Sequence, residues 1–233
     1  MKTNVLWLGL ALVAAAPLSA AFESVAVQVT VEPEMPAVLR MQGLRDGQVK
    51  LALDVDAKGR LVDCLVVSAS HSALIRPCIE AAREWRYKPA RYNGEPTAAR
   101  LELSINVSMT GSVVSRTAAD MLEDFMERVV GRHFDYKLCP PNEVDRPLVA
   151  VNRVSPDYAR DALREGVGGR VRVHFYVDES GNVRLPAVPA ETHPYLSAVA
   201  VQAMRGWKFE PPTRNGRPVL VAAVQEFDFG GRP

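Results

Sequence analysis

The sequence predicts an α+β fold of two small tandem domains, each a three-stranded antiparallel sheet with helices packed on one face. The stretch Trp85–Gly94 recurs 122 positions later as Trp207–Gly216, with Trp, Pro and Asn-Gly at the same spacing. Each copy follows two alternating runs and one run of helical spacing, and each precedes a last alternating run. Recurrence at a fixed displacement indicates a duplicated module.

The first repeat, residues 33–108, contains the apolar alternation of two strands and the spacing of one helix. Its strands are joined by the turn Asp56–Gly59, in which Asp bonds the downstream backbone and Gly accepts positive φ. Asn93-Gly94 between two extended runs predicts a tight hairpin. The expected elements are strands at 47–55, 61–67 and 101–107 and a helix at 73–85.

The second repeat, residues 155–230, has the same order and adds a helical run at its start. Ser155 and Pro156 suit the N-cap and the first position of that helix. Asp178–Gly181 repeats the turn of the first repeat. The expected elements are helices at 155–164 and 192–204 and strands at 171–177, 183–188 and 219–229.

Residues 109–154 have no counterpart in either repeat and are expected to form a linker with an amphipathic helix. The apolar side chains of Met121–Val130 fall on one helical face. That face either packs against the domains or forms a homodimer contact. Before the first repeat, the alternation in Phe22–Val31 predicts a strand or an extended arm.

The N-terminus, residues 1–21, has the pattern of a secretory signal peptide. Lys2 precedes an apolar run from Val5 to Pro17, and Leu18–Ala21 supplies small residues. The run is shorter than the ~20 residues of a membrane span, although an uncleaved single anchor is the alternative. The signal predicts export to an oxidising compartment.

Charge and motifs argue against several classes of function. The formal net charge is +1, whereas nucleic-acid binding requires a basic face. No hydrolase or metalloprotease motif occurs, so we expect no enzyme, no cofactor and no metal. His71 and His193 recur at one repeat position, where helix capping is a sufficient explanation, and a metal site is disfavoured because no carboxylate or Cys partner is evident nearby in the sequence. Trp85 and Trp207 are expected in the core rather than as ligand platforms.

Three cysteines give one further expectation. A disulfide between Cys64 and Cys78 would close a loop of about 15 residues, worth about 3 kcal/mol in the chain-entropy model. Zinc is the alternative, but Cys-x-x-Cys pairs are lacking. Cys139 is left free or available for intermolecular pairing.

The order of these elements resembles the C-terminal domain of the TonB energy-transducer family. In the second repeat the resemblance rests on Gly169, Val177-Asp178, Gly181, Trp207–Pro211 and Asn215–Pro218, and the first repeat keeps most of these positions. It covers about two thirds of the chain in two tandem copies. The chain departs from the family in its cleavable N-terminus and in lacking a long Pro-rich spacer.

The resemblance implies a periplasmic protein of the Gram-negative envelope that binds an outer-membrane TonB-dependent transporter by strand addition. This would support energy-dependent transport across the outer membrane. The competing hypothesis is a structural or self-association module of the envelope. The binding strand implied is the last one, with Val219, Val221, Ala223, Gln225 and Phe227 acting mainly through their backbone. Its edge could instead be covered by the first repeat or by the arm at residues 25–31.

Overall fold

The computed structural model describes residues 22–109, 111–116, 134–158, 167–189 and 192–230. The predicted signal peptide and the predicted helix Met121–Val130 lie outside these residues, as does most of the helix expected at 155–164. Among the described helices, none is long and apolar enough to cross a membrane.

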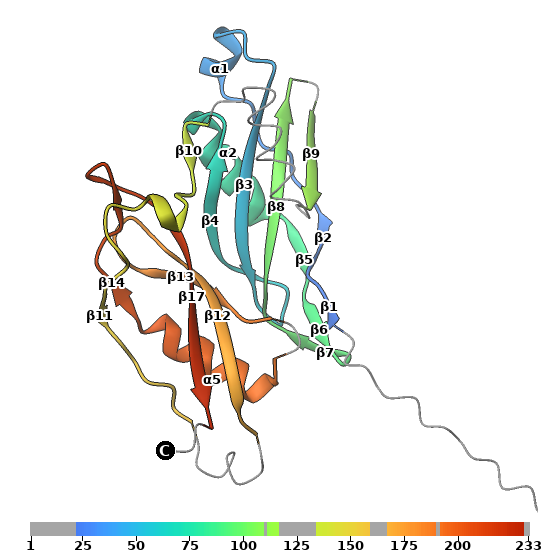
Figure 1. The fold of residues 1–233 in the computed structure, drawn as a ribbon. Helices are drawn as coiled ribbons and strands as arrows, with labels where there is room; N and C mark the ends of the chain where they lie inside the picture. Colours follow the sequence, from blue (N-terminus) through green and yellow to red (C-terminus); the bar gives the residue numbers. More distant parts are fainter. Residues whose placement is uncertain (1–21, 110, 117–133, 159–166, 190–191, 231–233) are drawn as a thin grey trace, which may run out of the picture.

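The described chain is a mixture of strands and helices, as predicted (Figure 1). The elements up to the end of the first repeat are β1 (Phe22–Glu23), β2 (Ala26–Val29), α1 (Ala37–Met41), β3 (Asp46–Val55), β4 (Leu61–Ala69), η1 (Ser72–Leu74), α2 (Ile75–Glu84), β5 (Arg86–Lys88), β6 (Ala90–Tyr92), β7 (Glu95–Thr97) and β8 (Ala99–Ser108). The segment between the repeats forms β9 (Gly111–Arg116), β10 (Tyr136–Lys137), η2 (Pro141–Glu143) and β11 (Ala150–Asn152). The second repeat forms β12 (Gly169–Val177), β13 (Val183–Ala187), α5 (Pro194–Arg205), β14 (Lys208–Phe209), β15 (Thr213–Arg214), β16 (Arg217–Pro218) and β17 (Val221–Phe229).

The two main sheets differ in size. The second repeat has the three strands expected of it, in the order β13-β12-β17. The first repeat has five, in the order β10-β4-β3-β8-β9, because the segment between the repeats adds one strand at each side. The expectation of a three-stranded sheet is therefore not confirmed for the first repeat, whose sheet also takes strands from residues 111–116 and 136–137.

The turns explain why the repeated motifs recur. Asn93 and Asn215 have φ of +52° and +51°, and the glycine after each is also positive, as a two-residue hairpin requires. Gly181 has φ +81°, and a Cβ there would lie 2.1 Å from the Phe209 carbonyl oxygen. Gly59 stands in the same relation to Tyr87, so the turn and the aromatic strand after the helix fit only with glycine.

The helix α2 covers one face of the first sheet and α5 covers one face of the second, and the other faces meet between the repeats. Leu51 and Leu53 of β3 are fully buried in the cluster that includes α2 residues. Ala52, between them, points to the opposite face and packs in a separate cluster with Tyr176 and Leu220 of the second repeat. Figure 1 shows β13 and β12 beside β4 and β3 at this junction. Both faces of the first sheet are therefore buried over this part of their length.

Hydrogen bonds at the rim reinforce the junction. The Tyr176 hydroxyl donates to Glu102 at 2.7 Å, and the Tyr136 hydroxyl donates to Glu179 at 2.7 Å. Burial and the bond to Glu179 raise the pKa of Tyr136 well above its ordinary value. Each bond joins one repeat, or the strand β10 added to it, to the other, and so restricts sliding between the sheets.

Candidate functional site: the outer edge of β17

The strand β17 is paired along only one of its sides. It runs antiparallel to β12 in continuous register from Val177↔Val221 to Gly169↔Phe229. On its outer side, Cys139 forms a parallel bridge with Val221, and the Cys139 N–H donates to the Leu220 carbonyl at 2.8 Å. In the described part of the chain, no strand pairs with the outer side of β17 beyond this point.

The Cys139 contact shows which backbone groups face outward. The Leu220 carbonyl points to the outer side, and backbone groups alternate sides along a strand. The N–H and C=O groups of Val224, Glu226 and Asp228 therefore lie on the outer edge. One of them is already engaged, because the Gln225 side-chain amide donates to the Glu226 carbonyl at 2.7 Å.

The two faces of β17 carry different side chains. Phe227 and Phe229 are buried with α5 residues, and the Phe227 ring lies edge-on to Trp207, with 5.8 Å between the ring centroids. The other face carries Val224, Glu226 and Asp228, all exposed. The outer edge is therefore bordered by an aromatic core on one face and by two acids on the other.

Two arginines of β12 stand behind the acids. Arg170 and Arg172 lie 3.8 and 3.9 Å from the Glu226 carboxylate, and all three side chains are largely exposed. Such exposed pairs contribute little to stability. Among the described residues, Asp228 forms no ion pair.

The equivalent edge of the first repeat is filled. The strand β8 corresponds to β17, because β8 pairs with β3 as β17 pairs with β12. Its outer side pairs with β9, from Leu103↔Arg116 to Ser108↔Gly111. These positions of β8 correspond, at the displacement of 122, to residues 225–230. The same edge is thus occupied in one repeat and unoccupied, within the described residues, in the other.

The N-terminal arm covers neither edge. The strand β2 pairs with β5, and β1 pairs with β6, both of the first repeat. Val25 is buried there at 1% exposure. Among the described residues, the alternatives in which the arm or the first repeat pairs with the β17 edge are therefore not observed.

The five predicted site residues differ in their position relative to β17 and in their burial. Val219 precedes β17, and its N–H donates to the Pro212 carbonyl. Val221 and Phe227 are buried, whereas Ala223 and Gln225 are partly exposed. The alternation described above directs the backbone groups of Val221, Ala223, Gln225 and Phe227 toward β12. Peptide binding by this strand stays a prediction. The backbone groups that point away from β12, however, belong to the alternate residues 224, 226 and 228 and not to the predicted ones.

The three cysteines are free thiols in the structure. Cys78 of α2 is buried in the first core, and Cys64 of β4 packs against the same cluster. Burial raises the pKa of Cys64 to about 11 and that of Cys78 to about 12, and a negative charge on Cys64 contributes to the second shift. The predicted disulfide is thus not formed here, although both thiols lie in one cluster.

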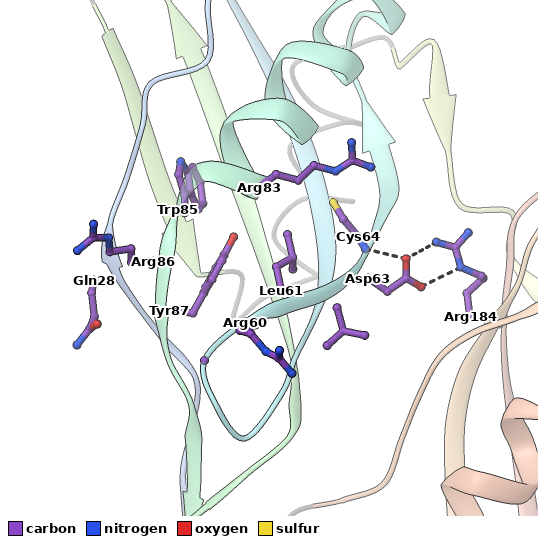
Figure 2. Close-up of a pocket in the computed structure, with 12 residues that line it drawn as sticks. Gln28, Arg60, Leu61, Asp63, Cys64, Arg83, Trp85, Arg86, Tyr87 and Arg184 are labelled. Carbon is purple, nitrogen blue, oxygen red and sulfur yellow. Dashed lines mark hydrogen bonds and ion pairs between the residues drawn. The ribbon is translucent and has the colours of Figure 1, made fainter.

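Cys64 also borders a surface pocket of about 630 Å³ (Figure 2). Arginines surround this pocket, at positions 60, 83, 86 and 184. Arg184 is bonded to Asp63, and Arg60 lies 2.6 Å from Asp56, so two of these cations are already paired. Figure 2 shows Arg83 and Arg86 pointing in different directions, so they do not converge on one ligand.

The repeated histidines and tryptophans have structural positions. His71 and His193 lie at the N-caps of η1 and α5, but neither side chain bonds the helix, and the capping explanation was wrong in that respect. Asp135 instead accepts from the Ser72 N–H at 2.7 Å. The described residues contain no cluster of three His, Cys, Asp or Glu that could hold a metal.

Each tryptophan ties the chain before its repeat to the helix end. The indole N–H of Trp85 donates to the Val31 carbonyl at 2.8 Å, and that of Trp207 donates to the Val154 carbonyl at 2.8 Å. Trp85 is buried in the first core, and Trp207 packs against the second. Their positions in or against the cores agree with the prediction.

Comparisons with known proteins identify the family to which the two repeats are similar. The family described as Gram-negative bacterial TonB protein C-terminal matches residues 31–108 and 154–230. Protein TonB of Vibrio cholerae serotype O1 is 31% identical over 80 residues, which are 34% of this chain and 33% of that protein. Protein TonB of Xanthomonas campestris pv. campestris is 31% identical over 78 residues, 33% of this chain and 34% of that protein.

The chain thus aligns with only about a third of the length of these curated relatives. A solution NMR structure of the Pseudomonas aeruginosa TonB C-terminal domain is 28% identical and covers 41% of this chain and 96% of its own, with a TM-score of 0.33. The two family matches begin at Val31 and Val154, the residues whose carbonyls accept from the tryptophans. The chain belongs to the TonB C-terminal family, which it matches in two separate copies.

Proposed function

We propose that this protein acts in the periplasm and binds extended segments of outer-membrane transporters along the outer edge of β17. Binding there would support energy-dependent transport across the outer membrane. The protein would act by binding and not by catalysis. The predicted signal peptide supports the location, and membership of the TonB C-terminal family supports the class of partner.

One observation carries this proposal. The outer edge of β8 holds the added strand β9, whereas the corresponding edge of β17 has no added strand beyond Cys139 among the described residues. An exposed strand edge is a template for another chain. The first repeat therefore shows that this edge of the fold accommodates a further strand, which supports the proposal that the second repeat binds one at the same edge.

The energetics suit reversible binding. The outward N–H and C=O groups at 224, 226 and 228 could form several backbone hydrogen bonds, each worth roughly 0.5–1.5 kcal/mol net. The ligand would have to displace the Gln225 amide from the Glu226 carbonyl and would lose conformational entropy. Moderate affinity is the expected result, because much of the gain is offset in this way.

The decisive variant removes one outward N–H and leaves the β12 ladder intact. Val224→Pro does this, because proline is tolerated on an edge strand where its N–H would face away from the sheet. Val224→Thr is the matched control, since it keeps the N–H and the β-branched shape. Val224 is 53% exposed, so neither change creates a cavity.

Binding is measured by fluorescence anisotropy with labelled, extended peptides derived from outer-membrane TonB-dependent transporters. We expect Val224→Pro to weaken binding by about tenfold, corresponding to about 1.4 kcal/mol, with Val224→Thr close to wild type. Circular dichroism checks that both variants stay folded. Equal binding by all three proteins, or no binding of any such peptide, would refute the proposal.

A further inference from the structure

The internal occupant of the first repeat shows what the edge accepts. Val114 of β9 lies opposite Ile105 of β8 and packs against the first core. Its neighbour Val113 lies opposite Asn106, on the other face, and is 68% exposed. The added strand therefore places one apolar side chain on the helix-covered face and leaves the alternate position in solvent.

The displacement of 122 transfers this pattern to β17. Ile105 corresponds to Phe227, which is buried with the second core. Asn106 and Ser104, which flank it on the other face of β8, correspond to Asp228 and Glu226; Ser104 is buried and Asn106 half-buried, whereas both acids are exposed. The edge of β17 thus keeps the apolar position and exchanges the two neutral polar positions for acids.

The acidic side chains on this face of β17 would lie next to a strand added at its outer edge. Arg170 and Arg172 lie one strand inward and partly neutralise Glu226. No ion pair to Asp228 is found in the described residues, and Asp228 is exposed. A strand added to the edge would lie on the side of β17 away from the arginines, so its side chains would meet the acids first. Opposite charges on neighbouring strands stabilise a pair and like charges destabilise it.

We infer that the segment bound by β17 alternates in character, with an apolar residue beside Phe227 and a lysine or arginine beside Asp228 and Glu226. This inference rests on the proposed function, because it specifies the ligand of the same edge. It concerns the faces of the added strand only, and holds whether that strand runs parallel or antiparallel to β17.

Three blocked and labelled peptides test the inference. The first is acetyl-Thr-Lys-Val-Lys-Thr-Lys-Val-Gly-amide, with the lysines on one face and the apolar side chains on the other. The second replaces every Lys by Glu, and the third replaces both Val by Ser. We expect the first to bind about five- to tenfold more tightly than either of the others at low salt. The preference over the Glu peptide should shrink as salt rises.

Three protein variants separate the charge effect from strand addition itself. Asp228→Lys should reverse the preference between the Lys and Glu peptides, and Asp228→Asn should reduce it without reversal. Val224→Pro should weaken every peptide that binds. If Val224→Pro weakens binding but the Glu peptide binds as well as the Lys peptide, the inference fails and the proposed function stands. If none of the three peptides binds although the transporter peptides do, only the inference fails; if Val224→Pro changes the binding of no peptide, transporter peptides included, both fail.

Discussion

The guanidinium of Arg184 donates two parallel hydrogen bonds to the carboxylate of Asp63, from Nε to Oδ2 at 2.9 Å and from an Nη nitrogen to Oδ1 at 2.6 Å. Arg184 belongs to β13 of the second repeat and Asp63 to β4 of the first, so this pair joins the two sheets (Figure 2). The bond to Asp63 raises the pKa of Arg184 above its ordinary value. Asp63 also accepts from the Cys64 N–H, which fixes the carboxylate in place.

This pair should measurably hold the repeats together. Charged hydrogen bonds contribute roughly 1.5–3 kcal/mol, but the two side chains keep about a third of their surface exposed and solvent screens them, so we expect a coupling near 1 kcal/mol. The measurement is a double-mutant cycle of Asp63→Ala and Arg184→Ala by denaturant unfolding. The cycle cancels the separate loss of the Cys64 N–H bond.

The exposed helical pair Arg76 and Glu80 is the control for that cycle. It has a comparable distance, 2.8 Å, but lies within one helix and in solvent. Its coupling should be clearly smaller than that of the pair between the sheets. Equal couplings would mean that the contact between the repeats is only a surface ion pair.

A second prediction concerns pH and the turn before β17. Asp145 accepts hydrogen bonds from the N–H groups of Asn215 and Gly216 at 2.8 and 2.9 Å. The Gly216 N–H, followed by the Thr213 hydroxyl and the Asn215 N–H, holds the pKa of Asp145 below its ordinary 3.8. A carboxyl group whose pKa is lowered by folding stabilises the folded state above its unfolded pKa, and this contribution is lost on acidification.

The variant Asp145→Asn should therefore melt at a lower temperature than wild type at neutral pH. The difference in Tm should be constant above about pH 5 and should narrow below 3.8, as pH falls through the folded pKa of Asp145. Asp157→Asn, an exposed change in the same half of the chain, should show no such difference. A Tm gap for Asp145→Asn that persists unchanged at pH 3 would contradict the assignment.

The repeated elements could be predicted from sequence because their signals are local. Asn215-Gly216 fixes a hairpin through two positive φ angles, and Asp178 accepts from the Ser180 and Asn182 N–H groups within its own turn. Alternation gave β3 and β12 their buried faces, since the period of a strand depends on its own residues. These features need no knowledge of the rest of the chain.

The features missed were those that depend on a distant partner. The strand β9 is short, has no counterpart in the described part of the other repeat, and forms against β8. The outward phase of β17 follows from the bond between Cys139 and Leu220, which the sequence of β17 does not contain. The five residues predicted from sequence are the alternate positions whose side chains are mostly apolar, a pattern that marks the buried face of the strand. The backbone groups available to a ligand belong to the residues between them.

The third prediction is that Cys64 and Cys78 form a disulfide in the exported protein. Both thiols lie in one core cluster, so the bond would join β4 to α2. Oxidation would remove two protons and two electrons, passed to the disulfide of a thiol–disulfide oxidoreductase. The raised pKa values of both thiols disfavour thiolate, so we expect slow oxidation without such a catalyst.

Mass spectrometry of protein purified from the periplasm, alkylated under denaturing conditions, checks this. In the wild-type protein we expect one alkylated cysteine, Cys139. In the control variant Cys64→Ser we expect two, Cys78 and Cys139. The oxidised protein should be more stable than the reduced protein by about 3 kcal/mol. Three alkylated cysteines in the exported wild-type protein would refute the disulfide.

The last prediction concerns association of two copies. An unprotected edge strand pairs readily with another, and charged side chains on the edge oppose this. Two β17 strands placed edge to edge would bring Glu226 and Asp228 of both copies close together, so these acids should keep the wild type from pairing through β17. We expect the double variant Glu226→Thr and Asp228→Thr to associate more strongly in sedimentation velocity across a concentration series, with Val224→Pro reversing the gain. The helix expected at Met121–Val130, which lies outside the described residues, would be a separate route to a homodimer, and Leu122→Lys with Phe125→Lys tests it. Loss of wild-type association in that variant would favour the helix contact, whereas a wild-type mass that stays monomeric at every concentration would exclude self-association as the function.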